Sequence, residues 1–220
     1  PAWDNIPALA VTSVGDLADG AKSLLVQTDA GALEISLYPF GARLRLGERT
    51  FGDYGMLEKE PEAVALSAES GTDTTVITGA GYRLKIHHSP FSFELFNGDC
   101  VIQRSPTDGH FVRQHRLPPL AKTDNGWILS LELNYDEAVY GLGEKWGKLD
   151  KRGQLIRSYN HDALGVNAEK SYKNTPYAWS PEGWNLFVHT PAPVTHGVGY
   201  GRRIIHHLRY DQIASYEIHH

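Results

Sequence analysis

The chain has 220 residues, of which 41% are hydrophobic and 21% are charged, and its formal net charge at pH 7 is −5. This length can bury the core of one large β domain, and the composition is typical of a globular protein. The negative charge gives no electrostatic basis for binding nucleic acid or an anionic membrane surface, and no apolar run approaches the ~18 residues that span a bilayer. We therefore predict neither nucleic acid nor a membrane as a partner.

Cysteine usage indicates the redox compartment. Cys100 is the single cysteine, which excludes an intrachain disulfide framework and suits a reducing compartment. We expect its side chain to be a small buried apolar group. The first residues contain neither a basic n-region nor an apolar h-region, so the sequence favours a cytoplasmic location.

Short apolar runs with a period of two follow one another along the first half of the chain. We expect an edge segment within residues 1–20, and a hairpin with one wet face from residues 23–28 and 32–38. Further strands are predicted over residues 42–46, 63–67, 74–78, 82–87, 91–96, 100–103 and 127–133.

The clearest alternation is at Phe91, Phe93 and Leu95, which are expected to share a buried face. The following Asn97-Gly98 predicts a type I′ hairpin turn. No long stretch holds the 3.6-residue period of a helix. The sequence therefore predicts an all-β fold, a single large antiparallel β-sandwich over residues 1–220.

Residues 139–190 differ from the rest because they are rich in glycines, aromatics and isolated charges. Aromatic faces beside a carboxylate, amides and a lysine are the groups that a sugar site needs. Core packing is nevertheless expected for most of the aromatics, which are Trp146, Tyr159, Tyr172, Tyr177, Trp179 and Trp184. The run 184–188 alternates poorly, so it is expected to be buried on both faces.

Asp162 is the strongest single candidate for a ligand-binding residue in this segment. An aspartate before Ala163-Leu164-Gly165 equally suits a turn cap that accepts a hydrogen bond from its own backbone. The nearby Gly141-Leu142-Gly143-Glu144 lacks the third glycine and the following helix of a phosphate loop. A tight turn at a strand end is expected there.

Metal and nucleophile motifs are weak. The histidine doublets, such as His87-His88 and His206-His207, would point to opposite faces of a strand, so they do not suit one metal ion. There is no Gly-x-Ser-x-Gly, and nothing in the sequence pairs Cys100 with a histidine. We predict no metal site, no cofactor and no catalytic residue within this chain.

Five motifs follow one another in the second half of the chain, and they are Tyr140-Gly141-Leu142-Gly143-Glu144, Leu149-Asp150-Lys151-Arg152-Gly153, Asn160-His161-Asp162-Ala163, Ser171-Tyr172-Lys173-Asn174-Thr175-Pro176 and Gly183-Trp184-Asn185-Leu186-Phe187-Val188. In this order they resemble glycoside hydrolase family 31, which holds α-glucosidases, α-xylosidases and relatives, and the similarity runs over about residues 100 to 200. The upstream strands are compatible with the galactose-mutarotase-like amino-terminal domain of such an enzyme. The pattern is lost at residues 201–207, and residues 215–218 are expected to rejoin it as the next strand.

The resemblance implies that this β-sandwich precedes a (β/α)8 barrel whose two carboxyls, ~5–5.5 Å apart, carry out retaining hydrolysis. A barrel alone takes ~250 residues, so the catalytic barrel is expected outside this chain, which would be a truncated amino-terminal domain that is inactive by itself. The implied function is to supply a substrate-binding loop to the active site of the barrel. The expected partners are an α-linked glucoside or xyloside and the chain's own barrel, and assembly into a homo-oligomer is left open.

By the same resemblance, Asp162 hydrogen-bonds sugar hydroxyls near the cleavage point, since a carboxylate that accepts from two hydroxyls binds strongly and directionally. Asn160 and His161 would shape the loop, and Tyr172 and Lys173 would brace it. One alternative is a stand-alone β-sandwich that binds carbohydrate on a flat exposed aromatic platform without cleaving it. Another, by analogy of fold only, is a mutarotase-like enzyme, which needs a histidine and a carboxylate converging in one cleft.

Overall fold

The computed structural model describes residues 6–47, 54–105, 111–112, 115–116, 118–164, 170–199, 203–209 and 214–220, and regular structure in these residues is strand alone. The strands of the first half are β1 (Val11–Val14), β2 (Leu24–Thr28), β3 (Gly31–Tyr38), β4 (Gly41–Leu46), β5 (Ser67–Ser70), β6 (Thr74–Gly79), β7 (Tyr82–His87), β8 (Ser92–Asn97) and β9 (Cys100–Arg104). The strands of the second half are β10 (Phe111–Val112), β11 (His115–Arg116), β12 (Leu120–Thr123), β13 (Gly126–Glu132), β14 (Tyr140–Gly141), β15 (Leu155–Ser158), β16 (Tyr177–Trp179), β17 (Asn185–Val188), β18 (Val194–Val198), β19 (Arg203–Arg209) and β20 (Ala214–His219). In this part of the chain no helix is long and apolar enough to cross a membrane.

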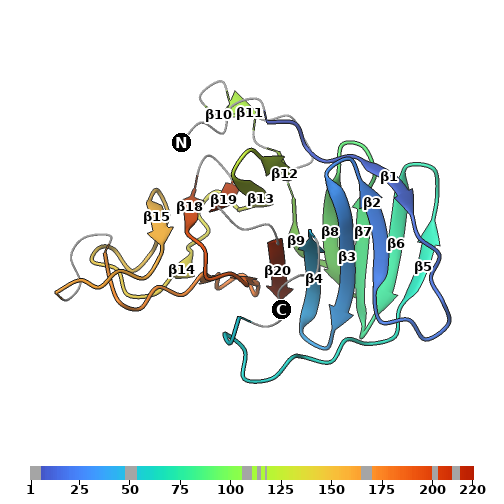
Figure 1. Ribbon diagram of the computed structural model, residues 1–220, viewed down its shortest axis with the longest axis horizontal. Coiled ribbons are helices and arrows are strands. Elements are labelled where there is room, and N and C mark those ends of the chain that lie inside the picture. The colour runs from blue at the N-terminus through green and yellow to red at the C-terminus, as the bar shows by residue number, and fades with distance from the viewer. Residues whose placement is uncertain are drawn as a thin grey trace.

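The strands form antiparallel sheets in layers. The largest has eight strands in the order β1-β2-β3-β4-β20-β17-β16-β14, and two five-stranded sheets have the orders β5-β6-β7-β8-β9 and β12-β13-β19-β18-β15. Figure 1 shows β1–β4 lying over β5–β9, with β12, β13, β18 and β19 on the other side of β9. Strands β9 and β13 contact each other, so the two five-stranded sheets meet at a seam. The predicted all-β antiparallel sandwich is confirmed.

The core lies between the β1–β4 end of the large sheet and the β5–β9 sheet. Phe91, Phe93 and Leu95 are fully buried in it, as their alternation predicts. Strand β2 alternates between buried and exposed residues, which confirms the predicted hairpin with β3. Burial of each large apolar side chain contributes about 1.5–3 kcal/mol, so these alternating runs account for most of the stability of this layer.

Strand β20 joins the beginning and the end of the chain within one sheet. It pairs with β4 on one side and with β17 on the other, which confirms the expected strand at residues 215–218. Its residue Glu217 faces Arg43 of β4, and the Arg43 Nη2 and Nε atoms lie 2.6 and 2.9 Å from Glu217 Oε1. Arg43 also pairs with Glu60, and His219 Nε2 lies 3.2 Å from Glu217 Oε2.

This ion pair is buried, so the protonation of its members matters. Burial alone would raise the pKa of the Glu217 carboxyl, but the hydrogen bond from His219 and the charge of Arg43 outweigh burial and lower that pKa below its usual range. Burial opposes the charge of Arg43, while Glu60 and Glu217 raise the pKa of its guanidinium. Both groups are therefore charged at neutral pH.

Two local expectations are wrong. Cys100 is exposed rather than buried, because it begins β9 opposite Asn97 at the edge of its sheet, directly after the hairpin turn. The turn itself is formed by Gly98 and Asp99, since Asn97 pairs with Cys100. Gly98 has φ +57° and Asp99 is not in the left-handed region, a combination that fits a type II′ turn better than the predicted type I′.

Candidate functional site

The candidate site is a loop between β15 and β16, formed by residues 159–164 and 170–174 of the described chain and called here the Asp162 loop. Two asparagines close its base. Asn160 Oδ1 accepts a hydrogen bond from the Asn174 backbone N at 2.7 Å, and Asn174 Nδ2 donates to the carbonyls of Tyr159 at 2.9 Å and Ser171 at 3.0 Å. The His161 backbone N also donates to the Ser171 carbonyl at 3.0 Å. The two arms of the loop are thus held together near their start.

The Gly141-Leu142-Gly143 turn supports the loop from below. The Glu144 backbone N donates to the Lys173 carbonyl at 2.8 Å. Gly143 has φ +79°, and a Cβ there would lie 2.3 Å from the Lys173 carbonyl oxygen. Only glycine meets both requirements, because a side chain would be strained in this conformation and would clash with backbone. The predicted tight turn is confirmed, and its purpose is a close approach to the Asp162 loop.

Lys145 adds a charged support that sequence reasoning missed. Its Nζ donates to the Arg157 carbonyl at 2.7 Å and to Asn174 Oδ1. Asn174 therefore bonds through both ends of its amide, and it is the residue on which the base of the loop depends. The signal that could have found it is its place inside the Ser171–Pro176 motif, where only Tyr172 and Lys173 were singled out.

Asp162 lies on the exposed part of the loop. Its carboxylate accepts no hydrogen bond from any described residue and forms no ion pair with one. The turn that it would cap continues into residues 165–169, which lie outside the described residues, so the turn-cap alternative stays open. The ring of His161, which is half-buried, packs edge-on against Tyr159 with centroids 5.1 Å apart. The Asp162 carboxylate thus lies exposed, without a partner among the described residues, on a loop whose base is closed by hydrogen bonds.

The other two predicted site residues reach solvent. Tyr172 is 45% exposed, and neither its hydroxyl nor the Lys173 ammonium has a hydrogen-bond or ion-pair partner in the described chain. Lys173 braces the loop only through its carbonyl, which Glu144 binds. Contact of Asp162, Asn160, His161, Tyr172 and Lys173 with sugar remains a prediction.

A cavity of ≈340 Å³ adjoins the base of the loop. Its walls come from the loop and from the segment after β17, and they are Met56, Ser158, Tyr159, Asn160, Asn174, Pro176, Thr190, Pro191 and Ala192. This volume is near the lower end of the ~300–1,000 Å³ that is usual for small-molecule sites. The cavity brings Asn160 and Asn174 together with residues that the sequence analysis did not single out.

The aromatics of residues 139–190 are more exposed than predicted. Trp184 is buried, but Trp146 is 79% exposed, and Tyr159, Tyr172 and Trp179 are also exposed. The expectation that most of them pack in the core is therefore wrong. Trp146, Tyr159 and Tyr172 lie outside the strands, so no strand directs these rings inward, and Trp179 lies on the exposed face of β16. The run 186–188 is buried as predicted.

The family model described as the glycosyl hydrolase 31 N-terminal galactose mutarotase-like domain matches residues 26–196. The chain belongs to this family. The assignment confirms the resemblance seen in the motifs from Tyr140 onward, and it extends that resemblance back through the β2–β9 strands. Family 31 relatives are glycoside hydrolases, so the parent family is hydrolytic.

Curated relatives of this family 31 domain include α-xylosidases and an α-glucosidase. An α-xylosidase from Emericella nidulans is 32% identical over 126 residues, which cover 56% of this chain and 15% of that protein. The α-xylosidase XylQ from Lactiplantibacillus pentosus is 36% identical over 101 residues, which cover 42% of this chain and 13% of that protein. The chain therefore corresponds to a small part of these enzymes.

Solved structures show the same fold at low sequence identity. A GH31 dextranase from Flavobacterium johnsoniae, complexed with isomaltotriose, has a TM-score of 0.74 at 17% identity, covering 99% of this chain and 26% of that chain. A GH31 α-xylosidase from a soil metagenome, complexed with xylose, has a TM-score of 0.68 at 15% identity, covering 94% of this chain and 32% of that chain. These likenesses confirm the mutarotase-like sandwich.

Proposed function

We propose that this family 31 domain supplies the Asp162 loop to the active site of a following catalytic barrel in a retaining α-glycosidase of the α-xylosidase or α-glucosidase type. The observation that carries the proposal is the exposed Asp162 carboxylate, which has no partner in the described chain although the loop beneath it is held rigidly. A free anion on a braced loop is suited to a ligand outside the domain. Family membership supports the identity of that ligand as a sugar.

The proposed chemistry is recognition of hydroxyl groups. A carboxylate has acceptor sites for two adjacent sugar hydroxyls, and such charge-assisted bonds are short and directional. The bond-breaking carboxyls belong to the barrel, where a retaining mechanism needs two of them ~5–5.5 Å apart. In this scheme the domain binds and orients the α-linked xyloside or glucoside, and the barrel cleaves it.

A second observation supports docking of this face onto a barrel. Trp146 is 79% exposed and Leu149 is 77% exposed, and Leu164 on the Asp162 loop is also fully exposed. Trp146 and Leu149 lie three residues apart, and large apolar side chains exposed close together suit a surface that associates with another body. We infer that the domain's own catalytic barrel covers part of this surface and thereby brings the Asp162 loop to the barrel mouth, where active sites of this fold lie.

The decisive test is the Asp162→Asn variant of the full-length enzyme. Loss of one charge-assisted hydrogen bond, worth about 1.5–3 kcal/mol, should lower kcat/KM on an aryl α-xyloside or α-glucoside by about 10- to 150-fold. Asp19→Asn is a matched control, because Asp19 is an exposed aspartate in a turn of the β1–β2 connection. Equal kcat/KM for the Asp162 variant and the wild type would contradict the proposal.

The stand-alone carbohydrate-binding sandwich remains the second candidate, and the exposed aromatics favour it. The ring pairs are tilted, however, with interplanar angles of 37° for Tyr140–Trp179 and 78° for Tyr159–His161, so they do not form a flat platform. Titration of the 220-residue chain with maltose or xylo-oligosaccharides, followed by Trp fluorescence, discriminates the two. Saturable micromolar binding without turnover would favour the binding module, and no response would favour the shared active site.

A further inference from the structure

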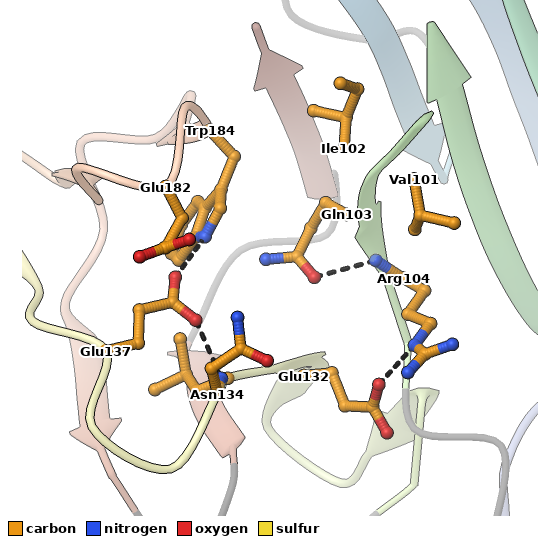
Figure 2. Close-up of a pocket in the computed structure, with 10 residues that line it drawn as sticks. Val101, Ile102, Gln103, Arg104, Glu132, Asn134, Glu137, Glu182 and Trp184 are labelled. Atoms are coloured by element: carbon orange, nitrogen blue, oxygen red, sulfur yellow. Dashed lines mark hydrogen bonds and ion pairs between the residues drawn. The ribbon is translucent and has the colours of Figure 1, made fainter. Parts of the chain in front are cut away.

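A second cavity lies away from the Asp162 loop, at the seam where β9 meets the end of β13. It has a volume of ≈350 Å³ and is called here the Gln103 pocket; its walls are Val101, Ile102, Gln103, Arg104, Glu132, Leu133, Asn134, Glu137, Glu182 and Trp184. The lining comes from β9, from the end of β13 and the segment after it, and from the turn before β17, and Figure 2 shows Gln103, Asn134, Glu137 and Trp184 around one space. None of them lines the cavity beside the Asp162 loop.

The walls of the Gln103 pocket are fixed by buried hydrogen bonds. Glu137 is only 5% exposed, and its Oε1 accepts from Trp184 Nε1 at 2.6 Å while its Oε2 accepts from the Asn134 backbone N at 2.7 Å. Across the pocket, Arg104 pairs with Glu132 and so ties β9 to β13. The polar groups are thus preorganised before any ligand arrives.

The pocket also contains a polar group that the protein does not use. Gln103 is 4% exposed, and its Oε1 accepts from the Arg104 backbone N at 2.7 Å. Its Nε2 donates to no group in the described part of the chain, and Figure 2 shows it pointing toward the side formed by Glu137 and Asn134. This donor faces the space of the pocket, where it is open to a ligand.

The mixture of charges selects the class of ligand. An anion would be repelled by Glu132, Glu137 and Glu182, and a simple cation would leave the Gln103 donor unused and would meet Arg104. A hydroxyl group both donates and accepts, so it suits a lining that offers an amide donor on Gln103 and carboxylate acceptors such as Glu182. Apolar residues also line the pocket, Leu133 and Trp184 among them, and apolar surface suits the C–H face of a ring.

We propose that the Gln103 pocket is a binding site for a neutral sugar ring, independent of the Asp162 loop. Its size, near the lower end of the range for small-molecule sites, suits one or two rings rather than a long chain. No histidine of the described residues lines it, so these walls do not provide the histidine and carboxylate pair that a mutarotase-like reaction needs. The site binds the sugar and does not convert it.

The test uses the full-length protein carrying Asp162→Asn, so that binding at the proposed active site is weakened. Crystals soaked with methyl α-D-glucoside or D-xylose should show the sugar within hydrogen-bond distance of Gln103 Nε2, and calorimetric titration in solution should show saturable binding. Adding Gln103→Glu, which keeps the acceptor and removes the donor, should weaken that binding by about tenfold or more. Glu182→Ala, at an exposed residue whose loss the fold tolerates, should do the same.

Each other outcome overturns the proposal. Sugar density confined to the Asp162 loop, or binding that neither Gln103→Glu nor Glu182→Ala weakens, would remove the Gln103 pocket as a sugar site. Occupancy of the pocket by ethanolamine in preference to either sugar would assign it to a cation instead. None of these results bears on the kinetic effect of Asp162→Asn, so failure here is distinguishable from failure of the proposed active-site role.

Discussion

The two ends of the eight-stranded sheet are built in different ways. At one end, β2, β3 and β4 are strands of five to eight residues whose apolar side chains alternate into a shared core. At the other end, β16 and β14 have three and two residues, and glycines, asparagines and a lysine hold the adjoining loops by hydrogen bonds. Hydrophobic burial holds the first end, and directional polar contacts shape the second, which carries the Asp162 loop.

The largest expected effect comes from breaking the buried pair that joins the two ends. Arg43→Met should lower the free energy of unfolding by about 3–5 kcal/mol, because it leaves the Glu217 carboxylate buried without its cation. Urea denaturation measures this loss. Lys22→Met is the matched control, because Lys22 Nζ lies 2.7 Å from Oε1 of the exposed Glu62. Such surface pairs contribute about 0–1 kcal/mol to the free energy of unfolding. Equal losses in the two variants would contradict the distinction between the buried and the exposed pair.

Gly143→Ala should have the next largest effect, at about 1–3 kcal/mol, because it combines an unfavourable backbone conformation with a clash against the Lys173 carbonyl. Gly81→Ala serves as the control, since Gly81 has a similar φ of +82° and nothing within 4 Å of an added Cβ. Thermal denaturation of both variants separates strain from clash. A Gly81 variant as destabilised as the Gly143 variant would show that the close approach to the Asp162 loop costs nothing.

The free energy of unfolding at low pH also distinguishes the buried pair from the exposed pair. Because the pKa of Glu217 is lowered in the folded state, the unfolded chain binds its proton first as the pH falls. The resulting stabilisation is present above the unfolded pKa of about 4.3 and is lost as the pH falls through the folded value. Glu217→Gln should therefore flatten the fall in unfolding free energy below about pH 4. Glu62→Gln should have a much smaller effect, because Lys22 also lowers the pKa of Glu62 but solvent screens this exposed pair. An unchanged acid limb in the Glu217 variant would show that the pair does not contribute to acid unfolding.

The smallest effect on stability is expected at the Asp162 loop itself. Asp162→Asn should change the free energy of unfolding by no more than about 0.5 kcal/mol, because the carboxylate has no partner in the described chain. Chemical denaturation of the same preparation used for kinetics measures it. A loss near ~1 kcal/mol or more would indicate the turn cap as the purpose of this aspartate.

Sequence reasoning succeeded where a local pattern determines the structure. The alternation of Phe91, Phe93 and Leu95 predicts their burial because a strand sends successive side chains to opposite faces. It failed at Trp146, which lies in a loop, and at Cys100, which lies in an edge strand. Whether such residues are exposed depends on which distant segments pack beside them, and a local pattern does not show this. The Gln103 pocket was likewise out of reach, since its walls come from β9, from the segment after β13, and from Glu182 and Trp184, which only the fold brings together.

Strand β20 sits between β4 and β17, so residues Arg43 and Glu217, far apart in the sequence, meet inside one sheet. During synthesis on the ribosome, β4 emerges long before its neighbour exists, and its open hydrogen-bonding edge must wait for the chain to be extended past residue 219. Pairings of such long range are slow to form, and the waiting edge is a natural target for chaperones. We expect a nascent chain halted before β20 to be held by chaperones or lost to aggregation.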